Sequence, residues 1–189
     1  MATNKTVLLV MDLQQGIVSL FPNSGEYIAR VAKAIHAARA KDIPIIYVTV
    51  NFRQGYPEVS RRNKAFSTVL ANSGNAFEEG NSAVHIVDDI APMAGKDILV
   101  TKRRVSAFAG SDLDVVLRSL GAETLVLTGV ATSGVVLSTL RQAADLDYAV
   151  TVLEDLCMDL DPEVHRVLVE KVFPRQAEVV SSETWIQSL

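Results

Sequence analysis

The chain has 189 residues, of which 49% are hydrophobic and 21% charged, and its formal net charge is −4. This length suits one domain, 1–189, and the acidic balance argues against nucleic acid as a partner, because phosphate recognition needs a basic face. No apolar run approaches the ~20 residues needed to span a bilayer. With a single cysteine, Cys157, and no signal-peptide core before Asp12, we expect a cytoplasmic protein without a membrane partner.

Six short apolar segments alternate with segments of helical periodicity. The predicted strands are 7–11, 45–50, 98–101, 124–128, 149–153 and 177–180, and the predicted helices are 25–40, 113–120, 134–144, 162–172 and 183–187. Strands that alternate with helices indicate a parallel sheet covered on both faces. The simplest such fold of the α/β class is a three-layer α/β/α sandwich with a doubly wound, mainly parallel six-stranded sheet.

Residues 51–82 form a long insertion between the second and third predicted strands, with little periodic pattern. Insertions of this length in compact domains usually carry function. We therefore interpret 51–82 as a lid or a partner surface.

Polar residues follow several of the predicted strands. Asp12 follows the first strand, Asn51 the second, Lys102 the third, and a turn of small residues beginning at Gly129 the fourth. In open α/β sheets the ligand binds at the carboxyl ends of the strands. A carboxylate, a lysine and a tight turn are therefore predicted to converge on one crevice.

Three short motifs stand in order at these strand ends. They are Asp12-Leu13-Gln14, Thr101-Lys102 followed by Ser106-Ala107-Phe108, and Gly129-Val130-Ala131-Thr132 followed by Thr139. Together they resemble the isochorismatase-like hydrolases, also called the cysteine hydrolase family, over nearly the whole chain. The resemblance implies that Asp12 and Lys102 are the family's catalytic Asp and Lys. In the family these two activate a cysteine that attacks an amide carbonyl, and a nearby ammonium does favour a thiolate.

The position of the family's cysteine is occupied by Val135, six residues after Gly129 and four before Thr139. Valine can neither attack a carbonyl nor be activated. The resemblance also implies a cis peptide bond between Val130 and Ala131, in a turn that directs backbone N–H groups at an oxyanion. The sequence thus predicts the family's nucleophile turn without its nucleophile.

Three other groups could carry or replace the lost chemistry. Cys157 lies after the fifth predicted strand and is interpreted as a buried structural thiol. Ser133 is an alternative nucleophile if its hydroxyl lies within ~3.2 Å of Asp12 or Lys102. Asp12 could instead act as a general acid, as the resemblance implies for true isochorismatases, which cleave a vinyl ether. That role needs a raised pKa, so burial would have to outweigh the neighbouring Lys102.

Two departures from the family bear on the substrate and on metals. Where isochorismatases carry Tyr-Ala-His, this chain has Ala131-Thr132-Ser133, so isochorismate is not expected as the substrate. The nicotinamidase branch binds a metal through an Asp and two histidines after the second strand, and 51–60 contains no histidine. Since His36, His85 and His165 are far apart in sequence, we expect neither a metal nor another cofactor.

The substrate pocket is predicted to include polar and aromatic groups near the strand ends. These candidates are Gln14, Asn51, Phe108 and Thr132, with Arg53, Arg103 and Arg104 available for a substrate carboxylate.

Two functions stay open, a thiol-free hydrolase of a C–N or vinyl-ether bond in a small molecule, and an inactive binding or scaffold protein. An open, polar cavity beside a cis turn would favour the enzyme. A cavity filled by Val135 and Phe108 would favour binding. By resemblance, and because 51–82 offers a surface, we expect a homo-oligomer, either a dimer or a tetramer.

Overall fold

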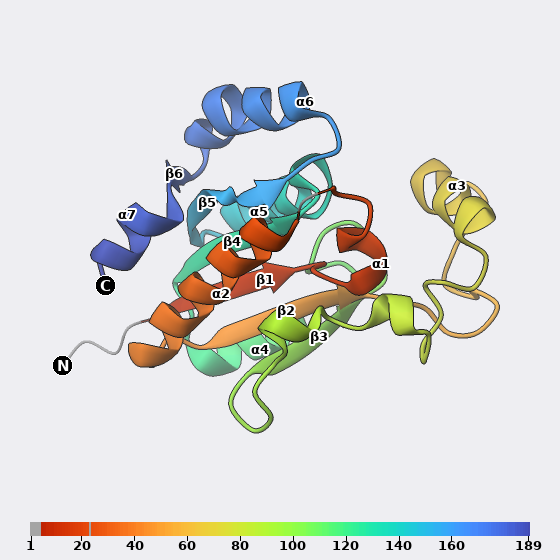
Figure 1. Ribbon diagram of the computed structural model, residues 1–189, viewed down its shortest axis with the longest axis horizontal. Helices are drawn as coiled ribbons and strands as arrows, with labels where there is room; N and C mark the ends of the chain where they lie inside the picture. Colours follow the sequence, from red (N-terminus) through yellow and green to blue (C-terminus); the bar gives the residue numbers. More distant parts are fainter. Residues whose placement is uncertain (1–4, 23) are drawn as a thin grey trace.

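The computed structural model describes residues 5–22 and 24–189 and shows a central sheet between two layers of helices (Figure 1). The strands are β1 Thr6–Met11, β2 Ile45–Val50, β3 Ile98–Lys102, β4 Thr124–Val130, β5 Ala149–Met158 and β6 Glu178–Val180. Their order is β3-β2-β1-β4-β5-β6, and every neighbouring pair is parallel. The predicted doubly wound α/β fold is therefore confirmed. The chain reverses its direction of winding between β1 and β4, where such folds bind ligands.

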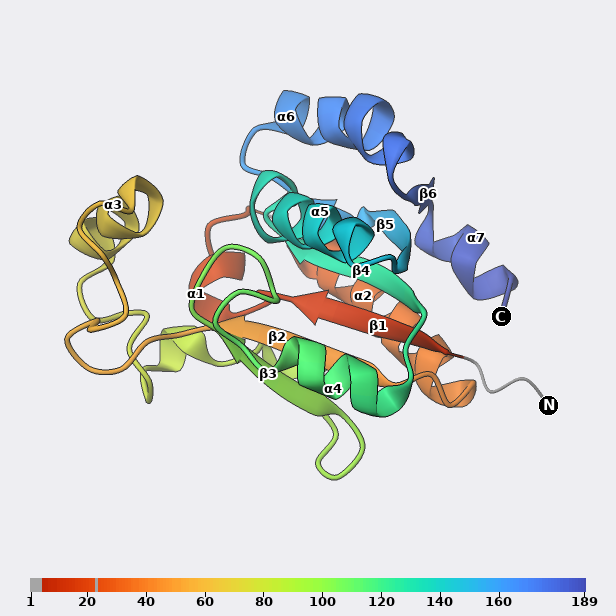
Figure 2. The same ribbon diagram turned by 180° about the vertical axis from the view of Figure 1, so that it is seen from behind.

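Seven α-helices are found in the described residues. They are α1 Gln15–Val18, α2 Gly25–Ala40, α3 Lys64–Ser73, α4 Leu113–Leu120, α5 Leu137–Asp145, α6 Pro162–Val167 and α7 Ser182–Gln187. Short 3-10 turns occur at Ser82–Val84, Asp88–Ile90 and Phe173–Arg175, and wider π-type turns at Thr132–Val136 and Leu168–Val172. Figure 2 shows the same arrangement from behind, with α4 and α5 in front of the sheet.

The core is divided by the sheet into two apolar layers. Successive residues of a strand point to opposite faces. Accordingly, Val7, Leu9 and Met11 pack with residues of α4 and α5, whereas Leu8 and Val10 pack with residues of α2 and α7. Because β1 is buried on both faces, its side chains are apolar without alternation, which is typical of a central parallel strand.

The structure differs from the sequence prediction in four elements. The helix expected over 162–172 ends at Val167 as α6, and the wide turn Leu168–Val172 follows. The insertion contains a helix, α3, which stands apart from the layers over the sheet (Figures 1 and 2). The helix expected over 134–144 begins instead as the wide turn Thr132–Val136 and becomes α5 at Leu137. Strand β5 continues to Met158, so Cys157 lies within the strand and its placement after the strand was wrong.

No helix within residues 5–22 and 24–189 combines the length and the apolar character that crossing a membrane would need.

Candidate active site

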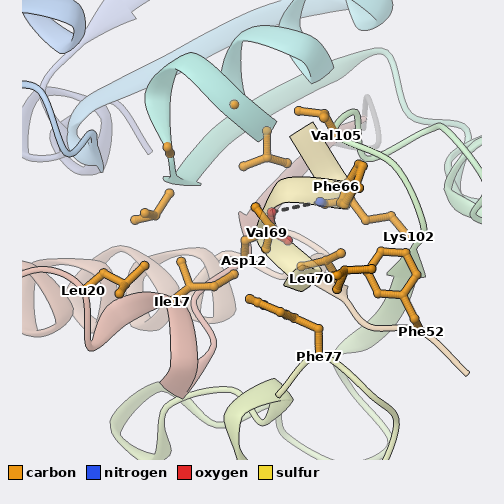
Figure 3. Close-up of a pocket in the computed structure, with 15 residues that line it drawn as sticks. Asp12, Ile17, Leu20, Phe52, Phe66, Val69, Leu70, Phe77, Lys102 and Val105 are labelled. Carbon is orange, nitrogen blue, oxygen red and sulfur yellow. Dashed lines mark ion pairs between the residues drawn. The ribbon is translucent and has the colours of Figure 1, made fainter. Parts of the chain in front are cut away.

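Asp12 and Lys102 meet at the carboxyl edge of the sheet. Asp12 directly follows β1 and Lys102 ends β3, and the intervening β2 separates the two strands. Lys102 Nζ lies 2.9 Å from Asp12 Oδ2 and also donates a hydrogen bond to the carbonyl of Arg104, at 3.0 Å. Only 3% of the Lys102 side chain and 7% of the Asp12 side chain are exposed. The predicted carboxylate and lysine thus form a buried ion pair, drawn as the dashed line in Figure 3.

The two oxygens of Asp12 have different surroundings. Oδ2 is paired with Lys102, whereas Oδ1 is buried and has no hydrogen-bond partner among the described residues. Burial raises the pKa of Asp12, and the charge and hydrogen bond of Lys102 oppose this rise without cancelling it. An unsatisfied buried acceptor costs about 1–3 kcal/mol of stability. A carboxyl group of this kind is typical of a functional site rather than of a structural ion pair.

A cavity of about 250 Å³ opens above this ion pair. Among the described residues that line it, Asp12 and Lys102 are the only charged or polar side chains. The other lining residues are Ile17, Leu20, Val50, Phe52, Phe66, Val69, Leu70, Phe77, Val105, Val130, Ala131, Gly134 and Val135. Figure 3 shows the lining side chains around the ion pair, with Phe66, Val69 and Leu70 from α3 among those labelled. The cavity therefore has a charged floor, which is the ion pair, and apolar walls.

The turn after β4 supplies the wall nearest the position of the family's cysteine. Gly129 has a φ of +143°, and a Cβ there would lie 2.3 Å from the carbonyl oxygen of Met11, so only glycine fits. The Val130–Ala131 peptide bond is cis. The wide turn that follows is closed by hydrogen bonds from the N–H groups of Gly134 and Val136 to the carbonyl of Ala131. This conformation brings the buried Val135 to the cavity wall.

None of the four predicted pocket residues, Gln14, Asn51, Phe108 and Thr132, belongs to the described cavity lining. Gln14 is fully buried: its amide nitrogen donates to the carbonyls of Val50 and Val84, and its oxygen accepts from the N–H of Val50. It therefore braces the end of β2. Phe108 is buried in the core and stacks on Tyr148, with ring centroids 6.2 Å apart.

The remaining polar candidates are also directed elsewhere. Thr132 is fully buried, and its hydroxyl lies 2.8 Å from His165 Nδ1. Ser133 is exposed, and its N–H donates to Asp159; among the described residues, no hydrogen bond joins its hydroxyl to Asp12 or Lys102. Asn51 lines a separate hollow.

Five predicted site residues are therefore brought together, Asp12, Lys102, Val130, Ala131 and Val135.

The apolar wall that 51–82 contributes to the cavity was not predicted from the sequence. Phe52, Phe66 and Phe77 all come from this stretch and all line the cavity. Half of the chain's six phenylalanines lie between 51 and 82, and this concentration was the available signal.

The three arginines considered for a substrate carboxylate bind other partners. Arg53 Nη1 lies 2.6 Å from Glu58 Oε1, and Arg103 Nη2 lies 2.7 Å from Glu79 Oε1. The guanidinium of Arg104 donates to the carbonyls of Glu58 and Arg103, at 3.0 and 2.6 Å. The bonds from Arg103 to Glu79 and from Arg104 to Glu58 tie the insertion to the loop after β3, and no arginine belongs to the described cavity lining.

The remaining candidates for metal binding or nucleophilic attack lie away from the ion pair. Within 5–22 and 24–189, no three His, Cys, Asp or Glu side chains are placed to hold a metal ion. Cys157 is buried in β5 and lines a different hollow, together with His165. Burial raises the pKa of its thiol to about 12, so it carries almost no thiolate at neutral pH.

Comparison with known proteins gives a clear relationship. Residues 6–184 match the isochorismatase domain. The chain belongs to the isochorismatase family. It is 32% identical to the ureidoacrylate amidohydrolase RutB of Pseudomonas syringae pv. syringae over 212 aligned residues, which cover 100% of this chain and 82% of RutB. Since the single cysteine is Cys157, this isochorismatase-family protein lacks the nucleophilic cysteine expected at 135.

Two solved structures superpose closely on this chain. An isochorismatase family protein from Burkholderia thailandensis has a TM-score of 0.83 and 27% identity, covering 96% of this chain and 93% of that one. N-carbamoylsarcosine amidase from Thermoplasma acidophilum has a TM-score of 0.77 and 25% identity, covering 94% and 96%.

Proposed function

We propose that this isochorismatase-family member is a small-molecule hydrolase that uses Asp12 as a general acid and forms no covalent thiol intermediate. The observation that carries this proposal is the buried Asp12 in the cavity floor, with one oxygen paired to Lys102 and the other without a hydrogen-bond partner among the described residues. Relatives named as amidohydrolases and amidases support hydrolysis as the type of reaction.

The raised pKa of Asp12 supports its proposed role as a general acid. A general acid must hold its proton near neutral pH, and burial raises the pKa of Asp12 despite the opposing charge of Lys102. In a vinyl ether, Asp12 would protonate the alkene carbon, water would add to the resulting oxocarbenium ion, and the adduct would collapse to a ketone and an alcohol. In a C–N bond, the proton would pass to the leaving nitrogen. In both reactions the attacking water returns a proton to Asp12.

Lys102 acts through Asp12 in this scheme. Once Asp12 has given up its proton, the ammonium 2.9 Å away stabilises the carboxylate that remains. The bond from Lys102 to the carbonyl of Arg104 keeps the ammonium in place through this change. Lys102 is therefore a positioning and charge-balancing residue.

Val135 and the cis turn complete the proposed site. The side chain of Val135 lines the wall where a thiol would stand, so no acyl-enzyme can form there. Backbone N–H groups of 130–135 would stabilise negative charge that develops on the substrate. The N–H groups of Ser133 and Gly134 already bond to Asp159 and Ala131, so this role falls to the others in the turn.

The experiment that tests the proposal is a hydrolysis screen of wild type, Asp12→Asn and Val135→Cys against small amides, esters and vinyl ethers. We expect wild type to turn over a substrate and Asp12→Asn to lose about 10²–10⁴-fold in rate. Amide hydrolysis that appears only in Val135→Cys would contradict the proposal, because it would mean that the native site lacks only its nucleophile.

The apolar lining and the lost cysteine favour one alternative, a catalytically inactive binding protein. Such a protein would bind small molecules in the same cavity, and neither wild type nor Val135→Cys would turn any of them over. Equal ligand affinity in wild type and Asp12→Asn, without turnover, would support this alternative.

We also propose that the protein acts in the cytoplasm as a homo-oligomer, a dimer or a tetramer. The family resemblance and the surface offered by 51–82 support this assembly. Sedimentation equilibrium of the purified chain would test it, and a monomer at all concentrations would contradict it.

A further inference from the structure

Three phenylalanines form one side of the cavity above the ion pair. Phe52 is buried, and its ring meets the ring of Phe66 edge to face, with centroids 5.6 Å apart. The N–H of Phe52 donates to the carbonyl of Phe77 at 2.9 Å, and the N–H of Glu79 donates to the carbonyl of Phe52 at 2.8 Å. These backbone bonds hold the turn containing Phe77 beside Phe52. The three rings therefore form one aromatic wall.

Helix α3 adds an apolar face that the other described residues leave partly exposed. Phe66, Val69 and Leu70 have the i, i+3, i+4 spacing of one helical face, and all three line the cavity (Figure 3). All of α3 lies within the described residues, none of its ten residues is buried, and 43% of Val69 is exposed. Removing the apolar surface of such a face from water favours a complex. A ligand in the cavity would cover this face.

The cavity offers few hydrogen-bond donors to an anionic ligand. Lys102 Nζ lies 2.9 Å from Asp12 Oδ2 and donates to the carbonyl of Arg104, so only one of its three N–H groups is left for a ligand. The neighbouring arginines are bound to other partners and do not line the described cavity. A ligand carboxylate would lose its water against apolar walls and gain at most one N–H in return, which is unfavourable.

We propose that the cavity selects an uncharged small molecule. An aryl or branched alkyl group packs against Phe52, Phe66 and Phe77, and one uncharged polar group, such as an amide or an ether, faces the free Oδ1 of Asp12. The cavity volume of about 250 Å³ lies below the range of drug-sized ligands, so the ligand is small. The identification of this ligand as the substrate rests on the proposed function. The proposal that it binds in the cavity does not.

The test compares benzamide with benzoate, which have the same ring and nearly the same shape but differ in charge. Isothermal titration calorimetry on wild type is expected to show benzamide binding about tenfold tighter or more. Hydrogen exchange should show that benzamide protects the amides of α3. Benzoate binding as tightly as benzamide, or more tightly, would overturn the proposal.

Variants locate the binding in this cavity. Val69→Asp on α3 and Leu20→Asp on the opposite side each place a charge at the cavity, and each is expected to weaken benzamide binding about tenfold. The matched control is Val115→Asp, at an exposed valine of α4 away from the cavity, which should bind as wild type does. Equal affinities in all three variants would contradict the proposal.

The results also separate this proposal from the proposed hydrolase. Benzamide binding without turnover of any substrate would support the proposed ligand class and contradict the proposed hydrolase. Turnover confined to carboxylate substrates would support the hydrolase and contradict the proposed ligand class.

Discussion

The floor and the roof of the cavity are built in different ways. The floor consists of Asp12 and Lys102 at the ends of two strands, where the sheet and its core hold both side chains buried. The roof consists of 51–82, in which the residues of α3 are all at least partly exposed. The groups proposed for chemistry thus lie on the rigid scaffold, and those proposed for ligand choice lie on an insertion that can vary without disturbing it.

The largest difference in stability between floor and roof is expected when one glycine in each is replaced by alanine. Gly129→Ala forces a Cβ to within 2.3 Å of the Met11 carbonyl oxygen, whereas Gly74→Ala, at the end of α3, meets no atom within 4 Å. Both glycines have positive φ. We expect Gly129→Ala to lose at least about 3 kcal/mol of unfolding free energy and Gly74→Ala about 1 kcal/mol. Urea denaturation measures both, and equal losses would contradict the comparison.

The brace behind the floor should carry stability rather than catalysis. Gln14→Leu removes three buried hydrogen bonds to the backbone of Val50 and Val84 and leaves those groups unpaired. We expect a loss of about 2–4 kcal/mol in unfolding free energy. Below its melting transition the variant should keep its rate constant per folded molecule. A selective fall in turnover with unchanged stability would instead place Gln14 in the site.

The floor should also govern the pH dependence of the reaction. As a general acid, Asp12 is active when protonated, so kcat/KM is highest below its pKa and falls as the pH rises through it. Lys102 lowers that pKa against the effect of burial. In Lys102→Met the falling limb should therefore move to higher pH, by about one unit. A limb that moves to lower pH would contradict the acid role of Asp12.

The smallest effect on stability is expected in the roof. Phe66 is only half-buried and belongs to a helix outside the core, so Phe66→Ala should change the unfolding free energy by less than about 1 kcal/mol. The same variant should raise KM about tenfold with little change in kcat, because the ring contributes binding rather than chemistry. A stability loss as large as that of a core phenylalanine would show that α3 is part of the folded core.

The sequence was most informative about the floor. Uniformly apolar strands, each followed by a polar residue, predict a buried parallel sheet, and parallel strands end at the same edge. That reasoning brought Asp12 and Lys102 together across a gap of 90 residues. It could not give the direction of each side chain, however. Gln14 is two residues from Asp12 but turns toward β2, and Phe108 turns into the core beside Tyr148.

The roof could not be predicted in the same way, because its contacts depend on where a long insertion returns to the sheet. The spacing of Phe66, Val69 and Leu70 marks an amphipathic face but does not show what that face covers. Strand β5 was predicted too short, over 149–153 instead of Ala149–Met158, for a related reason. Glu154 and Asp155 interrupt its apolar run, and a register shift against β4 accommodates the irregular stretch before Cys157.

The valine at 135 has a consequence for how the protein meets its chemical environment. Enzymes that depend on a thiolate are inactivated by peroxides and alkylating agents, which oxidise or alkylate the sulfur. Here the position facing the cavity carries only methyl groups, and the single cysteine is buried, with the pKa of its thiol at about 12. Oxidative stress and thiol-directed inhibitors would thus leave this site intact.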